Sequence, residues 1–473
     1  MSIEGVVAGR IGAVISSGRS IAAKCGPRAD AIAQYLRSGA ISAEEYRQIS
    51  ETAVSIAWQI DADPNRSIGT ILKDLPARGL ETQIDDLCGF MLHGENSFPV
   101  AHNIPYLALR FMVRALDKTD CHVHISNNLT NDEVSEHFPG RRIRHIGDDG
   151  FIRGTQDLSY VARESCLRFL LDGVSTFDLR FNPSKKLGDK DVEDYSLRIE
   201  RNIEAVTNGA NAAIEMCWEL TEADINPQIG LMLSFDRKKS HEGELLFALK
   251  AGLDKRFNLS GIGVAGQEGL LESEMDKVAG KWDSVFKACR AKGFRVTSHL
   301  GDFRNARGYY AGQGISDLGE MLESYLRFVE TQLKIMLPCD GLGHAYIFNP
   351  EFLISPLWDT KSYTPLSLRD AGYGEYADRI EAMIEAYDVK KFVIEHCPSA
   401  AVRNFSTVHA YSNLPLNYWM DGGFKVKIGT DAGIFSYNGP RSLSEDVTRV
   451  LLSTDYSARQ ILSLVGVDIL PRF

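Results

Sequence analysis

From residue 118 to the C-terminus, short β-rich runs alternate with amphipathic helical stretches. The runs that read as strands cover residues 118–124, 174–181, 228–235, 258–264, 294–299, 339–344, 391–396 and 424–430. The helical stretches between them include 160–171, 190–220, 270–292, 315–336 and 374–387. Eight strands, each followed by a crossover, are the number that a closed parallel barrel requires. The sequence therefore predicts an α/β fold, a (β/α)8 TIM barrel spanning residues 116–473.

An open, doubly wound sheet is the competing fold for this alternation. It predicts a glycine-rich phosphate turn directly after the first strand. Residues 121–124 read Cys-His-Val-His at that place instead. The closed barrel is therefore the favoured architecture.

Residues 1–115 precede the barrel and carry no chemical motif. Ser42 and Glu45 form a capping-box pattern, in which each side chain satisfies an orphan backbone amide at a helix start. Apolar residues then recur at three- and four-residue spacing, which predicts one buried stripe; they are Tyr46, Ile49, Ala53, Ile56 and Ile60. We expect an N-terminal helical extension that serves as a cap, a lid or an oligomer contact, and the sequence favours none of the three.

Composition argues against several classes of partner. The chain of 473 residues has a formal net charge of −11, whereas a nucleic-acid groove needs a concentrated basic face. The eight cysteines include no Cys-x-x-Cys pair, which indicates buried free thiols in a reducing compartment. No signal-like start is present, and no run approaches the roughly eighteen apolar residues of a membrane span. We expect a cytoplasmic protein with a small-molecule substrate and no nucleic-acid or membrane partner. A homo-oligomer contact through residues 1–115 is one of the three roles left open for that region.

Polar residues gather at the ends of the predicted strands. His122 and His124 end the first strand at spacing i, i+2, so strand alternation points both imidazoles to the same face. His299 ends the fifth strand, His344 ends the sixth, and Asp431 follows the eighth. Active sites of such barrels lie at this end of the strands. Imidazole and carboxylate donors suit a borderline divalent ion, Zn²⁺ first and Fe²⁺ second, with one position left for water.

From residue 118 onward, the chain resembles the adenosine and AMP deaminase branch of the metal-dependent amidohydrolase superfamily. The motifs that carry the resemblance keep the order of the family. They are His-x-His (Asp120 to His124), Arg-Phe-x-Pro (Arg180 to Pro183), Val-Ala-Gly-x-Glu (Val264 to Glu268), His-x-Gly-acid (His299 to Asp302), Gly-His (Gly343 and His344), Cys-Pro-Ser (Cys397 to Ser399) and Gly-Thr-Asp (Gly429 to Asp431).

The resemblance implies a role for each matched position. The ligands of one zinc ion would be His122, His124, His299 and Asp431. His344 would orient the attacking water and, with Asp431, manage its proton, while Asp302 would protonate the ring nitrogen beside the attacked carbon. The expected substrate contacts are Gly266 near the ring edge, His124, and Asn127 in the long loop after the first strand. Two-metal relatives usually bridge their ions with a carboxylated lysine after the fourth strand; residues 262–268 contain none, so one ion is expected.

Three positions depart from the family pattern. Asp302 stands where the family has glutamate. Because its side chain is shorter, the substrate or the loop would have to be shifted for Asp302 to deliver the proton. Ala432 stands where purine deaminases carry an aspartate that reads the five-membered ring, and alanine accepts no hydrogen bond. Ala400 follows Ser399, after which the family often has asparagine. Ala432 argues for a different purine-like substrate, a different ring orientation, or another polar residue that supplies the contact.

Three hypotheses follow. The leading one is a zinc-dependent hydrolytic deaminase that acts on an adenosine-like purine nucleobase, nucleoside or nucleotide. The second keeps the metal and hydrolyses a non-purine amide, lactone or imine. The third is a catalytically lapsed relative that binds a nucleoside or serves in an assembly. Two weaker features remain open. The basic patch Arg141–His145, together with Lys238 and Lys239, could recognise a phosphate or form solvated loops. His396 could lie in the barrel mouth or in the core.

Overall fold

The computed structural model describes residues 42–75, 80–93, 103–125, 129, 131–143, 150–184, 195–221, 226–237, 256–266, 268–301, 303–349, 367–404, 411, 414–431 and 442–468. Its centre is one sheet of eight parallel strands that follow one another in chain order. The strands are β1 (Lys118–His124), β2 (Val174–Phe181), β3 (Gln228–Asp236), β4 (Leu259–Ala265), β5 (Arg295–Leu300), β6 (Gly341–His344), β7 (Val393–His396) and β8 (Lys425–Ile428). All eight predicted strands are confirmed, with small shifts at their ends.

The sheet closes on itself between its first and last strands. Val123 of β1 and Asp431, just beyond β8, form an isolated parallel bridge. This contact joins the two edges that an open sheet would leave exposed, which gives the predicted (β/α)8 barrel. The doubly wound alternative is thereby excluded.

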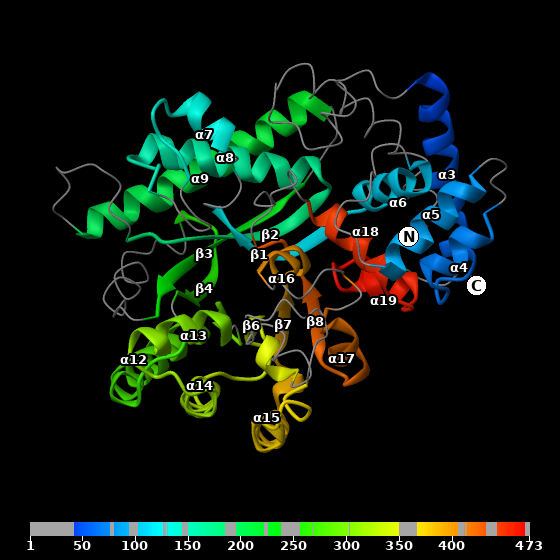
Figure 1. Cartoon of the computed structure of the whole chain (residues 1–473). Coiled ribbons are helices and arrows are strands. Elements are labelled where there is room, and N and C mark those ends of the chain that lie inside the picture. Colours follow the sequence, from blue (N-terminus) through cyan, green and yellow to red (C-terminus); the bar gives the residue numbers. More distant parts are fainter. Residues whose placement is uncertain are drawn as a thin grey trace.

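Helices cover the outside of the barrel (Figure 1). They are α7 (Asn131–His137), α8 (Thr155–Leu171), α9 (Tyr195–Thr221), α12 (Glu272–Arg290), α13 (Phe303–Gly312), α14 (Leu318–Leu333), α15 (Gly374–Ala386), α16 (Pro398–Asn404), α17 (Leu416–Asp421), α18 (Leu443–Ser453) and α19 (Ala458–Ser463). Of two short 3-10 turns, η4 (Tyr346–Phe348) follows β6 and η5 (Val389–Lys391) precedes β7. The crossover helices α8 and α12 pack on the strands that follow them: α8 lies against β2 and α9, and α12 against β5 and α14. Their apolar faces and the outer face of the sheet form the core.

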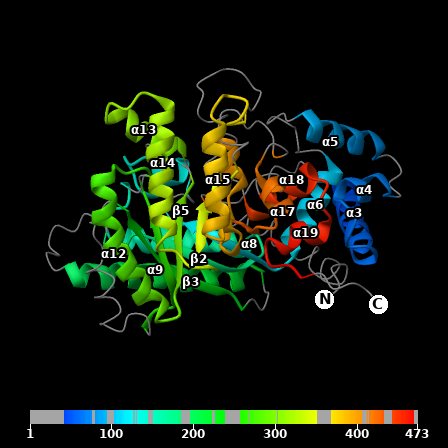
Figure 2. The same ribbon diagram turned by 90° about the horizontal axis from the view of Figure 1, so that it is seen from below.

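Among the described residues before the barrel, four helices are present: α3 (Ala43–Ala62), α4 (Ile68–Lys73), α5 (Glu81–His93) and α6 (Ile104–Ala115). The capping box at the start of α3 is confirmed, because Glu45 donates its amide to Ser42 Oγ while Glu45 Oε2 accepts from the Ser42 amide at 2.8 Å. The buried stripe is confirmed for Ile49, Ala53, Ile56 and Ile60; the side chain of Tyr46 lies outside the described residues. Figure 2 shows these helices gathered at one side of the barrel, where α6 packs against α3 and α18.

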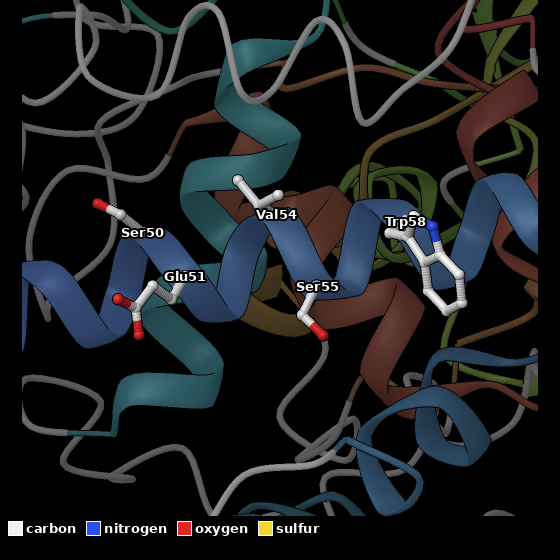
Figure 3. A pocket seen from close by; sticks show the side chains of 5 residues that line it. All are labelled: Ser50, Glu51, Val54, Ser55 and Trp58. Atoms are coloured by element: carbon white, nitrogen blue, oxygen red, sulfur yellow. The ribbon is translucent and has the colours of Figure 1, made fainter.

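The outer side of α3 carries a surface pocket (Figure 3). Its lining residues all come from this helix; they are Ser50, Glu51, Val54, Ser55 and Trp58. Trp58 is 52% exposed, and none of the predicted metal ligands lines the pocket. Cap, lid and oligomer contact therefore stay predictions for residues 1–115.

Most cysteines of the described residues are buried free thiols, as the sequence predicts; they are Cys121, Cys166, Cys217, Cys289 and Cys397. Cys339 differs, because its thiol is exposed in the turn before β6. Within the described ranges, no helix combines the length and the apolar character that a membrane crossing needs.

Candidate metal centre

The predicted ligands come from three places on the barrel rim. His122 and His124 lie on β1, and their shared face turns both imidazoles inward, as strand alternation dictates. His299 lies at the carboxyl end of β5, where it pairs with Gly343 of β6. Asp431 is held by its bridge to β1. Side chains far apart in the chain therefore converge because all of them sit at one end of a closed parallel sheet.

The nitrogen atoms that face one another lie at distances typical of ligands around one ion. His122 Nε2 is 2.8 Å from His299 Nε2 and 3.2 Å from His124 Nε2, and His124 Nε2 is 3.3 Å from His299 Nε2. Asp431 Oδ1 is 3.6 Å from His122 Nε2 and 3.7 Å from His124 Nε2. Donors in a tetrahedron around zinc at 2.0–2.1 Å would be about 3.4 Å apart. The donor set therefore fits one tetrahedral divalent ion.

His344, the last residue of β6, lies directly beside this set. Its ring stacks on His299, with centroids 5.1 Å apart, and is 5.3 Å from the ring of His122. Donor atoms of His122, His299, His344 and Asp431 also lie within 4.8 Å of one another, so His344 competes with His124 for the fourth place. The shorter separations favour His124 as the predicted ligand, with His344 beside the ligand set.

Burial keeps the ligand histidines neutral. It lowers the pKa of His122 well below its usual value, and the guanidinium of Arg180 adds to the effect. Burial and the neighbouring ring of His122 lower the pKa of His299 in the same way. The pKa of His124 falls to about 4 because of burial, although the carboxylate of Asp431 acts in the opposite direction. Neutral imidazoles offer the lone pairs that a metal ion requires.

Asp120 fixes the segment that presents Asp431. Its carboxylate accepts hydrogen bonds from the amide of His122 at 3.0 Å and from the hydroxyl of Thr430 at 2.8 Å. It also accepts from the amide of Thr430. Asp120 therefore joins the middle of β1 to the turn after β8. Asp120 belongs to the His-x-His motif of the sequence, from which no role was predicted for it.

Glu268 supports the loop after β5. It is 1% exposed, and its Oε2 accepts from the amide of Gly301 at 2.8 Å and from the hydroxyl of Tyr325 at 2.7 Å. Gly301 has φ +123°, and a Cβ there would lie 2.7 Å from the Cα of Ala345. Only glycine fits this crossing between the loops that follow β5 and β6. The motif around Glu268 was recognised in the sequence, but this role was not predicted.

Other predicted site residues have separate outcomes. Asp302, Asn127, Ala432, His145, Lys238 and Lys239 lie outside the described residues. Gly266 directly follows β4 with φ +90°, and a Cβ there would lie 3.2 Å from Asp236 Oδ1 at the end of β3.

His396 is a core residue whose ring packs edge-on against Trp419, with centroids 5.3 Å apart. Arg141 of the basic patch donates to the carbonyl of Phe151 and pairs with Asp157.

No protein-family model matches the chain, and no curated protein matches it. Solved structures do match. The apo N6-methyl-AMP deaminase from Arabidopsis thaliana is 14% identical, covers 75% of this chain and 90% of that chain, and gives a TM-score of 0.46. An adenine deaminase from Arthrobacter aurescens is 15% identical over 73% of this chain and 96% of its own, with a TM-score of 0.40. A zinc-bound amidohydrolase from Burkholderia ambifaria is 16% identical over 73% and 79%, with a TM-score of 0.39. At these identities, activity and substrate have to be argued from the residues of this chain.

Proposed function

We propose that this chain is a zinc-dependent hydrolytic deaminase that acts on an adenosine-like purine nucleobase, nucleoside or nucleotide. The observation that carries the proposal is the meeting of His122, His124, His299 and Asp431 at ligand-like separations inside the barrel rim. The ordered motifs from His-x-His to Gly-Thr-Asp support the deaminase branch rather than another metal hydrolase.

These four residues would hold one divalent ion, Zn²⁺ first and Fe²⁺ second. When bound, the ion would bring the pKa of a water molecule close to neutrality. His344 is placed to orient that water, since its ring lies against the rings of His122 and His299. Asp431 and His344 would take up the proton as the water attacks the amino-bearing carbon. Asp302 would give a proton to the adjacent ring nitrogen, and the proton taken from the water would pass to the departing amino group, so that ammonia leaves. The new hydroxyl would return a proton to Asp302 as it becomes a carbonyl.

One residue of the sequence favours a second candidate. Ala432 offers no acceptor for a purine five-membered ring, so hydrolysis of a non-purine amide, lactone or imine is the alternative. The same alanine, together with Asp302, is compatible with a lapsed site that binds a nucleoside without turnover. All three hypotheses use the same metal centre. They differ in the expected result, which is ammonia release, carboxylate release, or binding without turnover.

The test is an assay of purified protein whose metal content is measured by elemental analysis. Aminopurines and aminopyrimidines are screened for ammonia release, and amides and lactones for carboxylate release. Ammonia release from an aminopurine that disappears in Asp302→Asn, disappears on chelation and returns with zinc would support the proposal. Asp283→Asn on the surface helix α12 is the matched control and should keep full activity.

Three other outcomes reject the deaminase proposal. Ammonia release that survives either chelation or Asp302→Asn contradicts the mechanism. Carboxylate release without ammonia release favours the second candidate. Binding of a nucleoside without turnover across the whole panel favours the lapsed site.

A further inference from the structure

Charged side chains fill the barrel interior beneath the metal ligands. They are Asp178 and Arg180 of β2, Arg295 of β5 and Glu395 of β7. Barrels of this kind usually fill this space with branched apolar residues. The side chain of Glu395 is 0% exposed and that of Arg180 is 2% exposed. The side chains of Arg295 and Asp178 are 31% and 18% exposed, so Glu395 and Arg180 are the buried pair of the layer. Burying two charges is costly unless both are paired. Such a layer calls for a functional reason.

Glu395 is the acidic member of this layer that contacts a predicted metal ligand. Its Oε2 accepts from Arg180 Nη2 at 2.7 Å and lies 2.9 Å from His122 Nδ1. Its Oε1 accepts from Arg295, which also donates to Asp178 Oδ2 at 2.9 Å. Both arginines donate as well to the carbonyl of Cys121, the residue before His122. The layer therefore supports the first metal ligand through its side chain and through its backbone.

The hydrogen bond to Glu395 selects one tautomer of His122. A neutral imidazole has one N–H, and His122 Nε2 faces the other donor atoms, so Nε2 must offer its lone pair to an ion. The N–H is then on Nδ1, where the carboxylate of Glu395 accepts it. Arg180 Nη1 also lies 2.9 Å from Nδ1, but a guanidinium only donates and would favour the opposite tautomer. Glu395 therefore favours the tautomer of His122 whose Nε2 can bind a metal ion over the tautomer that carries a proton on Nε2.

The backbone of β6 makes room for this carboxylate. Gly341 has no side chain, and a Cβ there would lie 2.5 Å from Glu395 Oε1 and 2.9 Å from its Cδ. An alanine at 341 would displace Glu395 without removing any charge from the layer. The sequence thus offers two independent ways to disturb the same contact.

We propose that Glu395 is a positioning residue that fixes the metal-binding tautomer and orientation of His122, with Arg180 and Arg295 holding its carboxylate in place and Gly341 giving it space. Carboxylates that accept from metal-bound histidines act in this way, and their loss typically weakens metal binding by about 10- to 100-fold. The inference rests on the metal centre of the proposed function, but not on the reaction or its substrate.

The experiment measures metal binding to the full chain. Zinc affinity is obtained by competition with a chromogenic chelator, and the visible spectrum of the Co²⁺-loaded protein reports ligand geometry. Glu395→Gln keeps the shape of the side chain and removes its charge, so we expect zinc affinity to fall by about 10- to 100-fold and the cobalt spectrum to change. Gly341→Ala should shift both readouts in the same direction.

Glu445→Gln is the matched control. Glu445 is also buried and paired with two arginines, Arg110 at 2.8 Å and Arg449 at 2.8 Å, and it accepts from Tyr106 at 2.9 Å. Its contacts join α18 to α6 rather than to the metal ligands. We expect the thermal midpoint of this variant to fall while the zinc affinity of the folded protein stays at the wild-type value.

Two results would overturn the inference. Wild-type zinc affinity and cobalt spectra in both Glu395→Gln and Gly341→Ala would show that His122 needs no such support. A wild-type chain that binds neither ion would remove the metal centre, and with it the proposed function. If the wild type binds zinc but deaminates nothing, the proposed function fails, while the affinities of the two variants still decide the inference.

Discussion

The backbone N–H of Asp431 donates to the carbonyl oxygen of His122 at 2.7 Å, so two predicted metal ligands also close the barrel between β8 and β1. The carbonyl of Asp431 in turn accepts from the amide of His124 at 3.0 Å. Closure of the fold and assembly of the donor set are therefore one event. Removing the side chain of Asp431 should affect metal binding, whereas disturbing its backbone should affect the whole barrel.

Substitutions at Asp431 separate these two roles. Asp431 has φ +59°, a left-handed conformation that asparagine tolerates and β-branched residues do not. We expect Asp431→Asn to fold normally but to lose most of the zinc-dependent rise in thermal midpoint. Asp431→Val should also lose about 1–3 kcal/mol of unfolding free energy in the metal-free protein. Thermal and urea denaturation with and without zinc measure both effects. Equal stability of the two metal-free variants would contradict the backbone role.

Gly343 keeps two ligand rings in place. A Cβ there would lie 2.7 Å from His299 Cδ2 and 3.0 Å from His122 Cε1. We expect Gly343→Ala to push these rings aside and to weaken zinc binding by at least about tenfold, as loss of ligand support does elsewhere. Gly280→Ala on α12, where a Cβ meets nothing within 4 Å, is the control and should leave zinc affinity unchanged. Chelator competition decides; unchanged affinity in Gly343→Ala would show that the rings can adjust.

The contact between Glu268 and Gly301 should matter for turnover more than for metal binding. Glu268→Ala removes the acceptor of the Gly301 amide and frees the loop that leads to Asp302. Misplacing a reacting group by about 1 Å can lower the rate by roughly 100-fold. We expect kcat to fall by about 10- to 100-fold with zinc content at the wild-type level, as measured by steady-state kinetics and elemental analysis. Tyr325→Phe keeps the contact with Gly301 and should have a smaller effect. Loss of zinc in Glu268→Ala would assign it to the metal centre instead.

His396 should make the metal-free protein sensitive to acid. Burial lowers its pKa to about 3, and neither ring nitrogen has a hydrogen-bond partner in the described part of the chain. Between pH 3 and about 6.5 the unfolded chain binds this proton and the folded chain does not, so stability falls as the pH falls. The loss amounts to at most about 1.4 kcal/mol per pH unit from this residue.

Comparison with His396→Phe isolates that contribution. The difference in unfolding free energy between the wild type and this variant should shift in favour of the variant as the pH falls from 6.5 towards 4. Urea denaturation of the metal-free proteins at several pH values measures it, and the other histidines cancel because both proteins carry them. A difference that does not change with pH would mean that His396 is protonated, or exposed to water, in the folded protein.

The contrast between Glu395 and His396 marks the limit of sequence interpretation. The two residues are adjacent, and strand alternation requires them to point to opposite faces of β7. No local pattern indicates which face holds the charged layer. The tertiary structure sends Glu395 to His122, which precedes it by 273 residues, and His396 to Trp419 in the core. From the sequence, the location of His396 stayed open between the barrel mouth and the core, and no role was predicted for Glu395.

Local periodicity determined the eight strands and the predicted metal ligands, because strand length, helix spacing and the residue at each strand end are properties of short segments. What only the tertiary structure decided is which buried side chains meet across the barrel. The pairing of Glu395 with His122 and the space opened by Gly341 depend on the register of strands far apart in the chain. Register is set when the whole sheet closes, since a shift of one residue would turn every side chain of a strand to its other face.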